Sequence, residues 1–82
     1  MPLYFFDVRD KQGLHRDDTG LELPHLDAAI AEGRRALADM SRDVLAEGGD
    51  DKLEIVIRDH GEGPIRLALS LTTERPKDDK LA

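Results

Sequence analysis

Three histidines are the first residues in this chain that could do chemistry, because imidazole binds metal ions and transfers protons near neutral pH. They are His15, His25 and His60, and each falls in a predicted turn or polar segment. His15 is followed by Asp17 and Asp18, so nitrogen and oxygen donors for a metal ion stand close together there. However, no two histidines have the i, i+4 spacing of a helical zinc site. We therefore predict that the histidines are solvated and that the chain holds no metal ion.

Serine nucleophiles and phosphate-binding loops are not indicated either. Ser41 and Ser70 fall in a predicted helix and a predicted strand, away from the sharp strand-to-helix turn that exposes a catalytic serine. No Gly-rich segment joins a strand to a helix as a phosphate loop does. The adjacent acids at 50–51 and 78–79 are interpreted as solvated carboxylates. Because a chain of 82 residues has little volume for a water-excluding cleft, we predict no catalytic residue, no cofactor and no enzyme activity.

Composition and charge argue against nucleic acid and membrane as binding partners. The chain has no cysteine, a formal net charge of −6 and a pI of about 4.9. Binding to a phosphate backbone relies on Lys and Arg displacing counterions, so the domain alone is not expected to bind nucleic acid. No apolar run approaches the roughly 18 residues of a membrane span. The N-terminus lacks the basic and long apolar segments of a signal peptide, so we predict a cytoplasmic protein without membrane contact.

The longest periodic stretch, residues 26–47, predicts an amphipathic helix. Asp27 is the predicted N-cap, and the pair Gly48-Gly49 is expected to supply a residue with positive φ at the C-terminus. Gly33 in mid-helix costs about 1 kcal/mol relative to Ala, which predicts a close approach of the helix backbone to its neighbour. The apolar stripe consists of Leu26, Ile30, Gly33, Leu37, Met40 and Val44.

Alternating apolar residues predict strands on both sides of this helix. Residues 53–58 and 65–71 alternate and flank a short Gly-containing loop, which is typical of an antiparallel hairpin. The aromatic run 3–8 predicts a first strand, and 14–17 predicts a weak second strand at a sheet edge. Residues 21–24 are expected to approach the helix in an extended form, with their leucines tucked beneath it.

The order of elements predicts an α+β fold, β-β-α-β-β, with an antiparallel sheet of about four strands and one long helix packed on one face. Residues 1–73 form a single domain in this interpretation. Residues 74–82 are charged, contain Pro76 and are expected to be a disordered tail. The expected core consists of Tyr4, Phe6, Val8, Leu26, Ile30, Leu37, Met40, Val44, Leu53, Ile55, Ile57, Leu67 and Leu69.

The face of the sheet that the helix leaves open carries a candidate interface. Strand alternation places Leu3, Phe5, Val56 and Ala68 on this face. A contiguous exposed apolar patch usually marks association, and a chain this short buries only about 60–65% of its surface on folding. We therefore predict a homodimer. The alternative is that Phe5 is half-covered by the tail or by long neighbouring side chains.

Several motifs resemble a family of short bacterial proteins that is common in rhizobia and their relatives. They are M-P-L-Y-F-F-D at 1–7, R-D-D-T-G-L-E-L-P at 16–24, the Ala-rich helix, and I-V-I-R-D-H-G-E-G-P-I at 55–65. The resemblance covers nearly everything but the tail. That family is a domain of unknown function, so the resemblance implies one soluble bacterial domain and no active-site residue. In the Arg16-Asp17 and Arg58-Asp59 pieces, which enter Gly-containing turns, we expect Asp17 and Asp59 to accept hydrogen bonds from turn amides.

A weaker similarity is to small antitoxin domains with a partial ribonuclease-H fold. Those domains often carry a C-terminal DNA-binding segment, for which the nine-residue tail is too short. The leading prediction is a non-catalytic association module, homodimeric through the open sheet face or a sheet edge. The alternative is an antitoxin-like regulatory protein that binds a small basic partner. A third option, a metal-responsive module using His15 and nearby acids, predicts a melting temperature that shifts with divalent metals.

Overall fold

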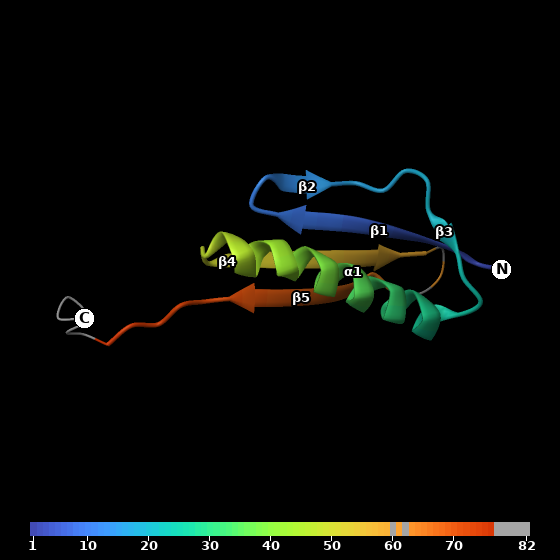
Figure 1. Cartoon of the computed structure of the whole chain (residues 1–82). Helices are drawn as coiled ribbons and strands as arrows, with labels where there is room; N and C mark the ends of the chain where they lie inside the picture. Colours follow the sequence, from blue (N-terminus) through green and yellow to red (C-terminus); the bar gives the residue numbers. More distant parts are fainter. Residues whose placement is uncertain (60, 62, 77–82) are drawn as a thin grey trace.

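The computed structural model describes residues 1–59, 61 and 63–76. Figure 1 shows a long helix lying across one face of an antiparallel sheet. The predicted α+β class and the β-β-α-β-β order are confirmed, with a short additional strand, β3, in the segment expected to be merely extended. The described elements are β1 (Leu3–Asp10), β2 (Gly13–His15), β3 (Leu21–Glu22), α1 (Leu26–Glu47), β4 (Asp51–Arg58) and β5 (Ile65–Leu71).

The sheet has the order β2-β1-β4-β5, and every pairing is antiparallel. The row Val8, Ile55 and Leu67 crosses β1, β4 and β5 and shows their register. β3 also pairs with β1, at the end opposite to β2. Because β2 and β3 share one edge of β1, the loop between them, residues 16–20, runs past the middle of that edge (Figure 1).

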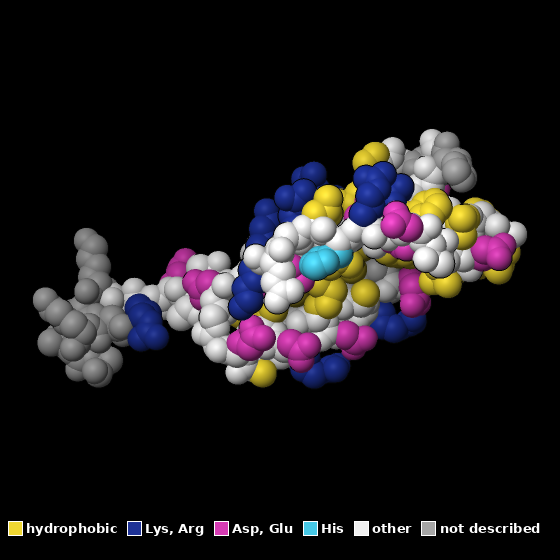
Figure 2. All heavy atoms as spheres, turned by 90° about the horizontal axis from the view of Figure 1, so that it is seen from above, with side chains coloured by type: hydrophobic (Ala, Val, Ile, Leu, Met, Phe, Trp, Pro, Cys, Tyr) yellow, Lys and Arg dark blue, Asp and Glu magenta, His cyan; other side chains and the backbone are white. Residues whose placement is uncertain are grey.

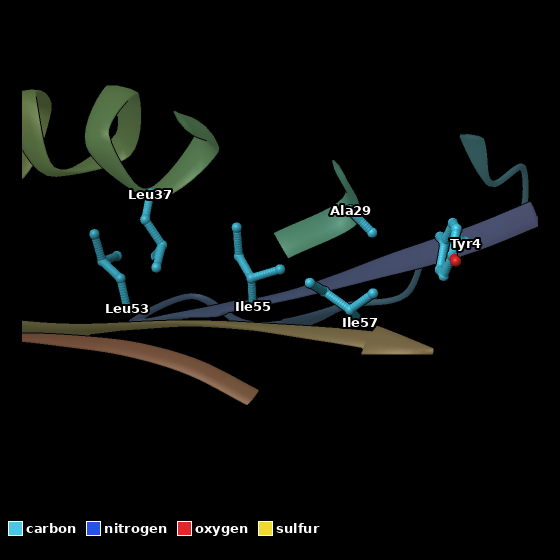
Figure 3. Packing of buried hydrophobic residues seen from close by; sticks show 6 residues of the cluster. All are labelled: Tyr4, Ala29, Leu37, Leu53, Ile55 and Ile57. Carbon is cyan, nitrogen blue, oxygen red and sulfur yellow. The ribbon is translucent and has the colours of Figure 1, made fainter. Parts of the chain in front are cut away.

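The core lies between α1 and the sheet. Figure 3 shows Ala29 and Leu37 pointing from the helix towards the sheet, where Leu53 and Ile55 rise from β4. All but one of the predicted core residues belong to this cluster or pack against it. The prediction was wrong for Leu69, which is 43% exposed. Leu69 lies in the outer strand β5, whereas α1 packs mainly on β4.

Gly33 makes the close approach that the sequence predicted. It is buried, and a Cβ atom at this position would lie 2.8 Å from Leu67 Cδ1 and 3.4 Å from Ile57 Cδ1. Side chains of β4 and β5 therefore occupy the space that a branched or bulky side chain at this position would need. The absence of a side chain at Gly33 lets the helix backbone approach the sheet closely.

The two leucines before the helix differ in burial. Leu23 packs against the core as expected. Leu21 was also expected beneath the helix, but it is 43% exposed. It belongs to β3, which pairs with the outer edge of β1 opposite Tyr4, and this position lies at the margin of the helix-covered area.

The helix begins and ends at the predicted residues, but its N-cap is different. His25 is the N-cap, and its Nδ1 accepts a hydrogen bond from the amide of Ala28 at 3.1 Å. Asp27, the predicted cap, lies in the first turn, where a carboxylate interacts favourably with the helix dipole. Gly48 ends the helix in the left-handed conformation with φ of 83°, as predicted.

The cap leads to a first testable prediction. Aspartate is among the strongly preferred N-cap residues, and histidine is not. We expect His25→Asp to raise the free energy of unfolding by about 0.5–1 kcal/mol, and His25→Ala to lower it by about 1 kcal/mol. Urea denaturation followed by circular dichroism measures both. Identical midpoints for His25→Ala and the wild-type protein would contradict the assigned cap.

Two predicted segments fall partly outside the described residues. His60 and Glu62 of the predicted turn, and residues 77–82 of the predicted tail, are not among them. The described part of the tail, residues 74–76, has neither helix nor strand. Just before it, the amide of Thr73 donates to Asp50 Oδ1 at 2.9 Å, which ties the chain after β5 to the start of β4.

Candidate functional site

A charged cluster lies on the sheet face that points away from α1. Asp7 in β1 is only 6% exposed, and it forms a diagonal ion pair with Arg58 at the end of β4, which lies opposite Phe5 in the register. Arg58 Nε donates to Asp7 Oδ2 at 2.7 Å, and Arg58 Nη2 donates to Oδ1 at 3.0 Å. The guanidinium also lies 5.0 Å from the centre of the Phe5 ring. This bidentate geometry is the strong form of an arginine–carboxylate pair.

Asp17 attaches the 16–20 loop to the same place. Its Oδ2 accepts from the amide of Phe6 at 3.0 Å, in the middle of β1 and between the parts that pair with β2 and β3. Its Oδ1 accepts from the amides of Thr19 at 3.0 Å and Gly20 at 3.1 Å. The predicted turn bonding of Asp17 is therefore confirmed. Between β2 and β3 no strand pairs with β1, and the Asp17 carboxylate accepts the hydrogen bond that a neighbouring strand would otherwise accept from Phe6.

The backbone of Asp17 completes the cluster. Its amide donates to Asp7 Oδ1 at 2.9 Å, and its carbonyl accepts from Arg58 Nη2 at 3.1 Å. We call Asp7, Asp17 and Arg58 the β1 clamp. Its charged groups bind one another and the backbone of the 16–20 loop, so the arrangement anchors this loop on the sheet.

The clamp keeps both carboxylates ionised. Hydrogen bonding by Arg58 lowers the pKa of Asp7 from its ordinary value of 3.8. Burial raises the pKa of Asp17, but the amides of Phe6, Gly20 and Thr19 outweigh this and hold it below 3.8. The same Asp7 pair raises the pKa of Arg58. Each group is therefore charged at neutral pH.

These pKa shifts predict how stability depends on pH. Because the carboxyls of Asp7 and Asp17 have lower pKa values in the folded state, their contribution is complete above the unfolded value of about 3.9. It is lost as pH falls through the folded pKa. We expect the unfolding free energy of wild-type protein to fall more steeply below pH 4 than that of Asp17→Asn. Denaturation midpoints from pH 6 to pH 2 measure this, and parallel curves would contradict it.

The predicted interface residues lie where strand alternation placed them, but three of the four are poorly accessible. Leu3, Phe5 and Val56 are half-buried, and Ala68 is exposed. The loop covers part of this patch, since a Cβ atom at Gly20 would lie 3.0 Å from the side chains of Leu3 and Phe5. Arg58 lies over the Phe5 ring as well. The alternative of a half-covered Phe5 fits this arrangement, and association through this patch stays a prediction.

The rest of the open face is polar and basic. Glu54 Oε atoms lie 3.8 Å from Arg9 Nε and 3.5 Å from Lys52 Nζ. Arg66 is an exposed residue of the same face on β5. Figure 2, which looks onto the β2 side of the molecule, shows several Lys and Arg side chains gathered on the side of the sheet away from α1. This surface is less suited to apolar contact than the sequence suggested.

A second candidate surface lies at the outer edge of β5. In the part of the chain that the structure describes, β5 has a strand neighbour on one side only, β4. Beside it, Leu69 is 43% exposed and Leu45 of α1 is 62% exposed. A hollow of about 160 Å³ separates helix and strand here. We call it the β5 groove, and its apolar lining consists of Val44, Leu45, Leu53, Leu69 and Leu71.

The histidines do not form a site together. His15 Nε2 lies 3.3 Å from Asp10 Oδ1, His25 caps the helix, and His60 is outside the described residues. Among the residues with assigned positions, no group of three or more His, Asp or Glu side chains could hold a metal ion. Within the same residues, no helix combines the length and apolarity needed to cross a bilayer.

Comparison with known proteins identifies a family match. Residues 3–72 match the family described as Domain of unknown function (DUF6894). No curated protein matches the chain, and no solved structure matches it.

Proposed function

This chain belongs to the DUF6894 family of domains of unknown function, and we propose that it is a non-catalytic association module that forms a homodimer through the β5 edge of its sheet. The observation that carries the proposal is the unequal protection of the two outer edges. The β1 edge pairs with β2 and β3, and Asp17 binds the amide between them. The β5 edge instead borders the apolar β5 groove and, beside Leu67, a second hollow lined in part by Arg34 and Arg66.

An outer strand presents backbone donors and acceptors that can pair with another chain. Proteins usually protect such an edge with charged side chains, prolines or a bulge. β5 runs for seven residues, Ile65–Leu71, and Arg66 is its single charged residue. Pairing along this edge would bring a partner's side chains against Leu69 and the β5 groove. Backbone hydrogen bonding and apolar burial would then favour the same contact.

Chain size supports the same conclusion. At 82 residues the hydrophobic core is small, and the fully buried large side chains among the described residues are Ile55 and Ile57. Burial of apolar surface contributes about 25 cal/mol per Å². Association adds such burial outside the monomer core, and a partner that binds only the folded state stabilises that state.

The test is the oligomeric state across dilution, with a matched pair of variants. Leu69→Lys places a charge at the β5 edge, and Leu14→Lys places one at an exposed leucine of β2 on the other edge. We expect sedimentation equilibrium to show a wild-type homodimer whose dissociation constant rises roughly 30- to 100-fold in Leu69→Lys, the range of an interface hot spot. Leu14→Lys should leave it unchanged. A wild-type monomer at millimolar concentration, or equal effects of both variants, would overturn the proposal.

The proposal includes a bacterial cytoplasmic setting, which rests on the motif resemblance to short rhizobial proteins. The antitoxin-like alternative, with a small basic protein as partner, is supported by exposed acids of α1, of which Asp39 and Glu47 already pair with Arg42 and Lys11. A pull-down from the source bacterium separates the two. A stoichiometric basic protein together with a monomeric domain would favour the alternative.

A further inference from the structure

We infer that the partner at the β5 edge is a second copy held in one register, in which the two β5 strands pair antiparallel about a two-fold axis through Ala68. This inference rests on the proposed homodimer and adds its geometry. It predicts which residues meet, on which side the helices lie, and where a cross-link will form.

Symmetry limits how two β5 edges can meet. Only a two-fold axis perpendicular to the sheet makes the paired edge strands antiparallel, and the resulting interface uses the same residues of both copies. This axis leaves both α1 helices on the same face of the joined sheet. Directly opposite residues of an antiparallel pair point to the same side. Helix-side residues of one β5 therefore oppose helix-side residues of the other.

Charge and strand length then select the register. Centred on Ala68, all seven residues of β5 are paired with the partner's seven. A shift of the centre to Arg66 would oppose two arginines, which is destabilising, and would leave fewer residues paired. In the favoured register Arg66 opposes a partner serine. The resulting pairs are Ile65 with Leu71, Arg66 with Ser70, Leu67 with Leu69, and Ala68 with itself.

The favoured register also covers the apolar surface that the monomer leaves open. Leu69 is 43% exposed in the monomer. In the dimer the partner's half-buried Leu67 would stand directly beside it, on the side of the sheet that faces the helices. The β5 groove of each copy would therefore border the other copy, which gives the exposed Leu45 an apolar neighbourhood.

The open face of the joined sheet remains compatible with this pairing. Ser70 lies opposite Lys52 within one copy, so its small hydroxyl would separate Lys52 from the partner's Arg66. Ala68, on the axis, is exposed and small, so two copies of it can meet without a clash. No acidic residue lies in β5, and therefore the pairing buries no carboxylate against the partner strand.

Disulfide trapping tests the register directly, because the chain has no cysteine of its own. In Ala68→Cys the two thiols meet at the axis, where opposed Cα atoms are about 4.5–5.5 Å apart and a disulfide can form. In Ser70→Cys they lie four residues apart along the strands, about 13 Å, which is too far. We expect on the order of tenfold more covalent dimer from Ala68→Cys after mild oxidation, since the paired thiols have a high effective concentration.

A second variant keeps the test independent of any one substitution. The double variant Arg66→Cys with Ser70→Cys should form covalent dimers that neither single variant forms. Adding Leu69→Lys to Ala68→Cys should abolish its cross-link. If sedimentation shows a native dimer in which Ser70→Cys cross-links and Ala68→Cys does not, the register is wrong while the homodimer stands. If no variant dimerises, the proposed function itself fails.

Discussion

Replacing Asp17 with alanine is expected to lower the free energy of unfolding by about 3 kcal/mol. The carboxylate accepts hydrogen bonds from three backbone amides, those of Phe6, Thr19 and Gly20. The Phe6 and Gly20 amides are half-buried, and leaving such an amide without a partner costs about 1–2 kcal/mol, whereas the exposed Thr19 amide can bond to water. For a domain this small, that loss is a large part of a total stability of roughly 5–15 kcal/mol. Urea denaturation at neutral pH measures it.

The neighbouring residue provides a matched control. Asp18→Ala makes the same change of charge one position further along, but Asp18 is exposed. A surface substitution of this kind usually changes stability by no more than about 0.5 kcal/mol. Asp17→Asn should lie between the two alanine variants, because its amide group keeps one acceptor oxygen. Equal midpoints for Asp17→Ala and Asp18→Ala would show that the β1 clamp does not anchor the loop.

Losing the clamp should also change how the molecule associates. Without Asp17 the amide of Phe6 has no carboxylate acceptor, and the loop that contacts Leu3 and Phe5 is released. The middle of β1, between its pairings with β2 and β3, would then present an unpaired amide with apolar side chains beside it. A domain that can pair with other copies at both edges of its sheet can form open-ended oligomers. We therefore expect Asp17→Ala to form higher oligomers that the wild-type protein does not form.

The clamp marks a limit of what local sequence patterns can predict. The R-D pieces that precede glycines, R-D-D-T-G and R-D-H-G, correctly predicted turn bonding for Asp17 and for Asp59, whose Oδ1 accepts from the amide of Gly61 at 3.1 Å. The bond from Phe6 to Asp17 and the pair between Asp7 and Arg58 join residues distant in the chain. Such contacts depend on strand order, which periodicity does not specify.

The same limit explains the placement of the association surface. Alternation correctly identified the side of the sheet on which Leu67 and Leu69 point, and the helix period correctly identified the face of α1. However, burial also depends on whether the helix reaches the outer strand. Because α1 packs mainly on β4, Leu69 remains accessible and the β5 groove exists. The loop that the clamp anchors covers the part of the predicted open-face patch formed by Leu3 and Phe5.

Gly33 is the position where a single added side chain should do the most damage to the helix–sheet contact. A Cβ atom there would lie 2.8 Å from Leu67 Cδ1, closer than carbon atoms pack, and Ile57 Cδ1 lies at 3.4 Å. Gly33→Val adds two further methyl groups in the same direction. Overpacking a core costs typically 1–3 kcal/mol. We expect Gly33→Val to lower the free energy of unfolding by about 3 kcal/mol.

Two further variants separate overpacking from helix propensity. Ala31→Val introduces the same β-branched side chain in the same helix at an exposed position, and it should cost less than about 1 kcal/mol. Gly33→Ala should be nearly neutral, because the gain in helix propensity of about 1 kcal/mol offsets a contact with the movable end of Leu67. Equal unfolding free energies for Gly33→Val and Ala31→Val would show that the close approach of α1 to the sheet does not require a residue without a side chain at position 33. Leu67 and Leu69 point to the same side of β5, so displacing Leu67 should also raise the dissociation constant of the homodimer. Sedimentation equilibrium of Gly33→Val measures this effect.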